Sequence, residues 1–220
     1  ATRLYGITFK EVNNIPLYHP EVKTYEVYDN DGSFLAVLYT DFFPRESKGG
    51  GAWMTQFRGQ KMVDGKDQRP LVSLVMNFTK PTDTKPSLLT FNEVTTFLHE
   101  FGHALHGMFS KCTYGSTSMD GVSRDFVELP SQFMENYALE KEWLDTWAVH
   151  YQTGEKIPQE YIDKIKKSSN FQAGYASDRQ LSFGMVDMAW HTITEPVTEP
   201  LADFEQRAMG KTEIMPLVKG

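Results

Sequence analysis

A connector rich in breaker residues divides the sequence into two stretches with different hydrophobic patterns. Residues 80–86 are K-P-T-D-T-K-P, and two prolines in seven residues end any regular element. Before this connector, apolar residues alternate or run together in short segments, which predicts strands at 24–28, 34–43, 52–57 and 71–78. After it, the apolar residues follow a helical period. We therefore expect an α+β fold, with a small N-terminal β-sheet within residues 1–80 and a mainly helical part over residues 86–220.

Turn and capping residues refine these boundaries. The sequence D-N-D-G-S at 29–33 predicts a hairpin between the first two strands, because Asn, Asp and Gly tolerate positive φ. Thr90 and Glu93 can form a capping box for a helix that extends to about Ser110. Later helices are expected to begin near Pro158, Asn170 and Pro200.

The composition is that of an ordinary soluble globular protein. The 220 residues contain 40% hydrophobic and 23% charged side chains, so we expect one domain over residues 1–220 with a sizeable core. The net charge of −7 argues against nucleic acid as a partner. The densest basic run is expected on a solvated helix face and comprises Lys164, Lys166 and Lys167. No apolar run reaches the roughly 20 residues of a membrane span, so a membrane is not an expected partner.

The chain has a single cysteine, Cys112. One cysteine excludes an intrachain disulfide and is compatible with a reducing compartment, so we expect a cytoplasmic protein. The neighbours of Cys112 favour a buried apolar role over that of a nucleophile.

The predicted helix after the connector contains the motif H-E-F-G-H at 99–103. Residues four apart differ by about 40° around a helix axis, so His99 and His103 project from one face and can share an ion. Glu100 lies about 100° further round, beside the position of an activated water, where a general base belongs. The helix is wrapped in apolar residues, and buried histidines and carboxylates are costly without partners. A metal ion supplies that partner.

Two histidines do not complete a metal site. His106 and Phe109 occupy the positions where the longer metzincin motif requires Gly and His, which excludes that class. A carboxylate from a following helix is the common alternative, and the candidates are Glu128, Glu135, Glu140 and Glu142. Asp125 can cap a helix and place Glu128 in its first turn, where the dipole favours an ionised carboxylate. The pattern alone also fits a capping box between Asp125 and Glu128, so the third ligand stays open at this point.

Two motifs are similar to those of the thimet oligopeptidase family of zinc metallopeptidases. They are H-E-F-G-H-A-L-H-G at 99–107 and R-D-F-V-E-L-P-S-Q at 124–132. The similarity extends to G-G-A-W-M at 50–54, V-M-N-F at 75–78 and F-Q-A-G-Y at 171–175. The resemblance implies a zincin-like fold and one Zn²⁺ per chain, held by His99, His103 and Glu128.

The resemblance also implies an activity. Members hydrolyse short peptides with a zinc-activated water, and Glu100 corresponds to the general base that takes its proton and later delivers it to the leaving amine. The pair Arg124 and Asp125 resembles the bacterial peptidyl-dipeptidases of the family, which implies release of C-terminal dipeptides. An oligoendopeptidase of the same family, a deformylase-like zinc hydrolase with a third ligand other than Glu, and a zinc-bound fragment inactive on its own are the alternatives.

Family members are longer than this chain. The resemblance implies segments before Ala1 and after the last helices, the latter with His and Tyr residues that nothing in 209–220 matches. We therefore expect a catalytic-domain fragment whose partners are short peptide substrates and the missing N- and C-terminal segments.

Further residues near the motif have candidate roles. Glu135 lies seven residues past Glu128 and can accept a hydrogen bond from a ligand imidazole, although a plain salt bridge would also suit it. His106 is expected in a core or supporting role. The strand at 51–54 is a candidate for pairing with an extended substrate, because a Gly-rich edge allows close approach. The histidines without ligand spacing are expected to be structural or exposed, and they are His19, His150 and His191.

Overall fold

The computed structural model describes residues 1–210 and divides the chain into two compact units. The first spans Ala1–Ile157 and the second begins at Pro158. A small mixed sheet and several helices confirm the predicted α+β fold. The single catalytic domain over residues 1–220 stays a prediction. The prediction that nothing in residues 209–220 matches the C-terminal segment of the family mostly concerns residues 211–220, which lie outside the described residues.

The first unit contains a five-stranded sheet in the order β1-β2-β3-β7-β4. The strands are β1 (Thr8–Val12), β2 (Lys23–Tyr28), β3 (Phe34–Asp41), β4 (Trp53–Arg58) and β7 (Leu71–Val75). β3 and β7 are parallel, and the other neighbouring pairs are antiparallel. β4 therefore lies at one edge of this sheet.

Two further strands form a separate ribbon, β5 (Lys61–Val63) and β6 (Lys66–Gln68). The four predicted strands correspond to β2, β3, β4 and β7, whereas β1, β5 and β6 were not predicted. The turn between β2 and β3 has the expected chemistry. Gly32 adopts φ 82°, and the backbone N–H of Asp29 donates to Ser33 O at 2.9 Å.

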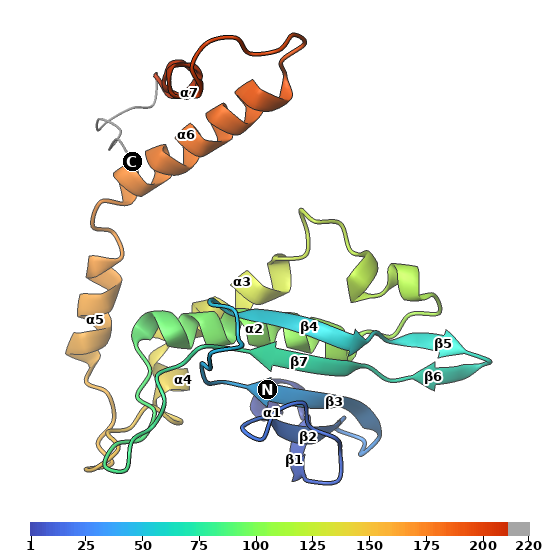
Figure 1. Cartoon of the computed structure of the whole chain (residues 1–220). Helices are drawn as coiled ribbons and strands as arrows, with labels where there is room; N and C mark the ends of the chain where they lie inside the picture. The colour runs from blue at the N-terminus through green and yellow to red at the C-terminus, as the bar shows by residue number, and fades with distance from the viewer. Residues whose placement is uncertain (211–220) are drawn as a thin grey trace. The chain divides into compact units, whose positions relative to one another are not determined.

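Alternate residues of the sheet face different surroundings. Ala36, Leu38, Val72 and Leu74 belong to the main hydrophobic core together with residues of the helix α2 (Phe91–Phe109). The intervening residues Val37 and Tyr39 join a smaller cluster with Val22 and Leu71. One face of the sheet thus carries α2, which runs alongside β4 and β7 in Figure 1.

The helix α2 begins where the capping residues predicted. The Thr90 side chain accepts from Glu93 N, and the Glu93 carboxylate accepts from Thr90 N at 2.7 Å, which completes the capping box. α2 packs against α3 (Leu129–Glu135). The other short elements of this unit are α1 (Thr2–Tyr5), η1 (Gly115–Thr117), η2 (Met119–Gly121), η3 (Asn136–Leu139) and α4 (Lys141–Leu144).

The second unit is helical over its described residues. It comprises α5 (Gln159–Ser168), α6 (Ala173–His191) and α7 (Leu201–Met209), and the rings of Trp190 and Phe204 pack at 4.1 Å between the last two. Pro158 and Pro200 are N-cap residues, as predicted, whereas α6 begins a few residues after Asn170. The predicted solvated lysines of α5 are exposed. Within residues 1–210, no helix is long and apolar enough to cross a membrane.

Candidate metal centre

The helix α2 places three polar side chains of the H-E-x-x-H motif close together. The rings of His99 and His103 lie one turn apart, with centroids 5.0 Å apart. Glu100 and His103 are buried, at 8% and 9% exposure, among the apolar residues of the core. Buried ionisable groups of this kind need partners.

A glycine in the motif lets a second helix approach α2. A Cβ atom on Gly102 would lie 2.5 Å from Pro130 O and 2.6 Å from Ser131 Cα, distances that no side chain tolerates. Only glycine therefore permits the start of α3 to lie directly against α2. This close approach brings Glu128, the residue before α3, to the two imidazoles.

The local structure at Glu128 corrects one prediction. Asp125 does not cap a helix that contains Glu128; Glu128 is itself the N-cap residue, and α3 begins at Leu129. The reason is Pro130 in the first turn, because proline lacks an amide hydrogen and is favoured where a helix starts. Residues before Glu128 form turns instead, in which Val127 N donates to Ser123 O.

Three ligand-type atoms from these elements converge. The Nε2 atoms of His99 and His103 each lie 3.1 Å from Glu128 Oε2. Two atoms bound to one tetrahedral zinc ion at about 2.0–2.1 Å would lie about 3.3 Å apart. Within residues 1–210 this trio is the one group of three or more such residues able to hold a metal ion. Glu140 and Glu142 take no part in it.

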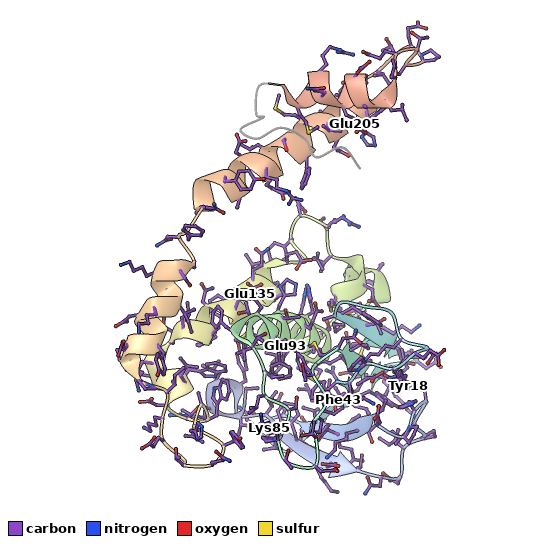
Figure 2. The ribbon with its side chains drawn as sticks, turned by 60° about the vertical axis from the view of Figure 1, so that its left-hand side comes forward. Tyr18, Phe43, Lys85, Glu93, Glu135 and Glu205 are labelled. Carbon is purple, nitrogen blue, oxygen red and sulfur yellow. The ribbon has the colours of Figure 1, made fainter. Side chains whose placement is uncertain are left out.

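Glu135 determines the tautomer of His99. The predicted contact is confirmed, since His99 Nδ1 lies 2.6 Å from Glu135 Oε1, and Figure 2 shows Glu135 beside α2. A carboxylate only accepts, so Nδ1 carries the proton and a neutral His99 has a lone pair on Nε2. That lone pair faces the Glu128 oxygen, also an acceptor. A cation or an added proton between these two atoms resolves the conflict, and the donor set suits zinc.

Local surroundings shift the protonation of the other groups. The Ser131 hydroxyl, which donates to Glu128 Oε2 at 2.7 Å, is the main cause that lowers the pKa of Glu128, and His103 and His99 act in the same sense. Burial lowers the pKa of His103, which favours the neutral imidazole that a metal requires. Sequence reasoning missed Ser131, although a serine three residues after a helix N-cap residue often bonds back to it.

Glu100 occupies a different environment from Glu128. Burial raises the pKa of Glu100, and the Glu128 carboxylate adds to this, while His99 and the backbone amide of Met54 act against it. A carboxylate with a raised pKa exchanges protons more readily near neutral pH. The contact with Met54 also places this carboxylate next to β4.

The remaining histidines lie apart from this trio. Burial lowers the pKa of the half-buried His106, which lines a hollow of about 470 Å³ with Tyr5, Phe109 and Cys112, and this fits the predicted core or supporting role. Cys112 is only partly buried, and its thiol contacts Thr117 O at 3.2 Å. His150 and His191 are exposed.

The fold and the cluster together define a class of protein. It is the class of α+β proteins in which an H-E-x-x-H helix and a carboxylate from a second element can hold one metal ion. The model of peptidase family M3 matches residues 1–219, so the chain belongs to this family.

Individual relatives support this membership. The chain is 42% identical over 210 residues to the dipeptidyl carboxypeptidase of Salmonella typhimurium, covering 95% of this chain and 31% of the relative. It is also 42% identical over 211 residues to oligopeptidase A of Escherichia coli, with 93% and 31% covered. A thimet-like oligopeptidase of Dictyostelium discoideum is 36% identical over 222 residues, with 99% and 33% covered. The chain thus spans about a third of the length of these curated relatives.

Proposed function

We propose that this chain carries the catalytic machinery of a zinc-dependent peptidase. His99, His103 and Glu128 hold one Zn²⁺ per chain, and Glu100 is the general base. The observation that carries the proposal is the convergence of two Nε2 atoms on one carboxylate oxygen, at 3.1 Å each, beside a buried glutamate. In this proposal the sheet and α2 form a zincin-like core within a single catalytic domain.

The donor set suits a catalytic rather than a purely structural metal site. Two histidines and one glutamate leave one zinc position open, as in hydrolytic zinc enzymes. The Glu128 side chain is 46% exposed, so the centre is open to solvent on that side. When bound, zinc supplies a Lewis acid that polarises a peptide carbonyl and lowers the pKa of a water molecule.

The protein residues move the proton. In the proposed reaction, a Glu100 carboxylate oxygen accepts a proton from the attacking water and then donates it to the nitrogen of the leaving amine. The raised pKa of Glu100 supports this role, because the same group must act as a base and then as an acid. Glu135 holds His99 in the tautomer whose Nε2 is free to bind the metal.

The edge strand β4 supports a peptide as the substrate. One side of β4 pairs with β7, and its other side is the free edge of the sheet. An extended peptide can add to such an edge through backbone hydrogen bonds. Met54, the last residue of the predicted substrate strand at 51–54 and the second residue of β4, contacts the proposed base, so a peptide paired there would pass close to Glu100.

The cleavage mode is proposed from the relatives. Those at 42% identity include both a dipeptidyl carboxypeptidase and an oligopeptidase A, so identity alone favours neither mode. We propose release of C-terminal dipeptides, on the resemblance of Arg124 and Asp125 to the peptidyl-dipeptidases. Cleavage within short peptides is the alternative.

Mass spectrometry of cleaved model peptides tests this function. The full-length protein should cut short peptides, lose activity in a zinc chelator and regain it when Zn²⁺ is restored. Peptides with an amidated C-terminus should resist cleavage if dipeptides are released, and should be cut if the enzyme is an oligoendopeptidase. Undiminished cleavage by the metal-free protein would refute the proposal. Zinc binding without cleavage by the isolated 220 residues would support the description of an inactive fragment.

A further inference from the structure

Glu128 is weakly constrained by its own backbone position. It is the N-cap residue of α3, where no side-chain cap bond forms. Its side chain is about half exposed. A glutamate has three side-chain torsions, and an exposed one samples several rotamers, each of which places the carboxylate elsewhere. Something must hold this carboxylate if its Oε2 is to face both imidazoles.

Ser131 supplies that restraint. Its side chain is fully buried, at 0% exposure, and its hydroxyl lies 2.7 Å from Glu128 Oε2 and 2.9 Å from Glu128 O. The backbone of Ser131 also lies against Gly102, where an added Cβ would come within 2.6 Å of Ser131 Cα. The serine is therefore fixed to the helix that carries both histidines and holds the carboxylate by its hydroxyl.

The hydroxyl contacts the same oxygen that faces the two rings. A carboxylate oxygen has two lone-pair directions, and a donated hydrogen bond occupies one of them. The bond to Ser131 leaves the second lone pair of Oε2 directed at the Nε2 atoms of His99 and His103, which lie 3.1 Å away. With Ser131 in place, Glu128 presents one chosen oxygen instead of rotating between one-oxygen and two-oxygen binding.

We infer that Ser131 is a positioning residue, which fixes Glu128 Oε2 as a one-oxygen metal ligand. This inference rests on the proposed function, because it requires Glu128 to bind the metal. Partners that orient metal ligands commonly contribute about 10–100-fold to metal affinity.

The test measures metal binding rather than turnover. In the full-length protein, Ser131→Ala removes the hydroxyl and Ser131→Thr keeps it. Ser110→Ala is the matched control, because its buried hydroxyl donates to a backbone oxygen, His106 O, at 3.0 Å. Zinc affinity is measured by competition with a chromophoric chelator, and the visible spectrum of the Co²⁺-substituted protein reports the ligand geometry. Thermal melting of the metal-free proteins checks that each variant is folded.

Ser131→Ala should bind zinc about 10–100-fold more weakly than wild type and should change the Co²⁺ spectrum. Ser110→Ala should do neither, and Ser131→Thr should restore the wild-type spectrum if its methyl group is accommodated. Zinc affinity of Ser131→Ala within twofold of wild type, with an unchanged Co²⁺ spectrum, would overturn the inference. Glu128→Gln separates a failure of the Ser131 inference from a failure of the proposed function. If Glu128→Gln loses zinc while Ser131→Ala does not, only the inference fails. If Glu128→Gln also keeps full affinity, the proposed function fails.

Discussion

Two clusters of ionisable side chains in the first unit differ in how far protein donors satisfy their acceptor atoms. Asp41, 1% exposed at the end of β3, is surrounded by protein donors. Arg45 binds both of its oxygens, at 2.8 and 2.9 Å, Lys48 reaches Oδ1 at 3.1 Å, and Tyr18 donates to Oδ2 at 3.0 Å. Burial raises the pKa of Asp41, but these donors together bring it below its usual value. The charge is neutralised entirely by the protein.

The centre on α2 is less fully supplied with protein donors, although the Ser131 hydroxyl donates to Glu128 Oε2. His99 Nε2, with its proton held at Nδ1 by Glu135, meets an oxygen of Glu128 that is itself an acceptor. Within residues 1–210, Nδ1 of His103 is buried without a hydrogen-bond partner. A cluster whose donors and acceptors are matched within the protein serves the fold, whereas one in which two acceptors face each other needs a cation or an added proton between them. The two clusters should therefore respond differently to substitution.

Removal of a histidine ligand should have the largest effect. His103→Ala should weaken zinc binding by more than about 100-fold and abolish peptide cleavage. Loss of a residue that only orients a metal ligand costs at most about that factor. Metal analysis after dialysis, with parallel activity assays on the full-length protein, checks this. His191→Ala, which removes an exposed histidine, should leave zinc content unchanged. If His103→Ala retained one zinc per chain, His103 would not be a required ligand and the two clusters would not differ in the proposed way.

Disruption of the Asp41 cluster should affect stability instead. Lys48→Met leaves a buried carboxylate short of one donor, and breaking a buried pair costs about 3–5 kcal/mol, less here because Arg45 remains. Denaturant unfolding should show this loss, while the folded variant keeps its zinc affinity. Lys80→Met is the matched control, since its exposed pair with Glu21 should contribute at most about 1 kcal/mol. Loss of zinc affinity in folded Lys48→Met would show that the clusters are coupled.

The close approach of α3 gives an intermediate effect. In Gly102→Ala the new methyl group would meet Pro130 O at 2.5 Å, so α3 must move and carry Glu128 away. Overpacking of this kind costs about 1–3 kcal/mol, and zinc affinity should fall with it. Gly184→Ala in α6 is the control: nothing lies within 4 Å, and alanine should stabilise the helix by up to about 1 kcal/mol. Equal unfolding free energies for the two variants would contradict this packing argument.

Lowering the pH should affect the two clusters over different pH ranges, with a smaller change than the substitutions produce. Burial holds the pKa of His103 below its usual value of about 6.5, so the neutral ligand is present above that pH. As pH falls below about 6.5 and through the lower folded pKa, protons displace the metal, and the rise in melting temperature given by zinc should shrink. The Asp41 contribution is instead retained until pH falls below about 3.9, because its folded pKa is lowered. Melting curves between pH 7 and pH 4 measure the zinc effect and, without zinc, the stability of the metal-free protein. A constant zinc effect down to pH 4 would count against histidine ligands.

The sequence predicted features that depend on neighbouring residues. The capping box at Thr90 and Glu93, and the turn around Gly32, follow from local chemistry and are confirmed. The hairpin of β5 and β6 was missed, although Asp64 and Gly65 both adopt positive φ and an Asp-Gly pair is a strong turn signal. Its strands have three residues each, too few for a clear periodic pattern.

Features that depend on contacts between helices were harder to predict. The contact of Glu135 with His99 was anticipated from helical spacing. The position of Glu128 was predicted only through the family resemblance, and the supposed cap at Asp125 was wrong because Pro130 sets the helix start. The support from Ser131 depends on how closely α3 approaches Gly102, a distance that no sequence pattern contains.

In the proposed mechanism, His99, His103 and Glu128 hold the metal and Glu100 moves the proton. The most direct test measures zinc content and peptide cleavage together in Glu100→Gln of the full-length protein. Loss of a general base costs about 10²–10⁴-fold in rate, so the variant should retain one zinc per chain and lose cleavage by at least that factor. Zinc loss that parallels the loss of activity would place Glu100 among the ligands and contradict its proposed role as the base.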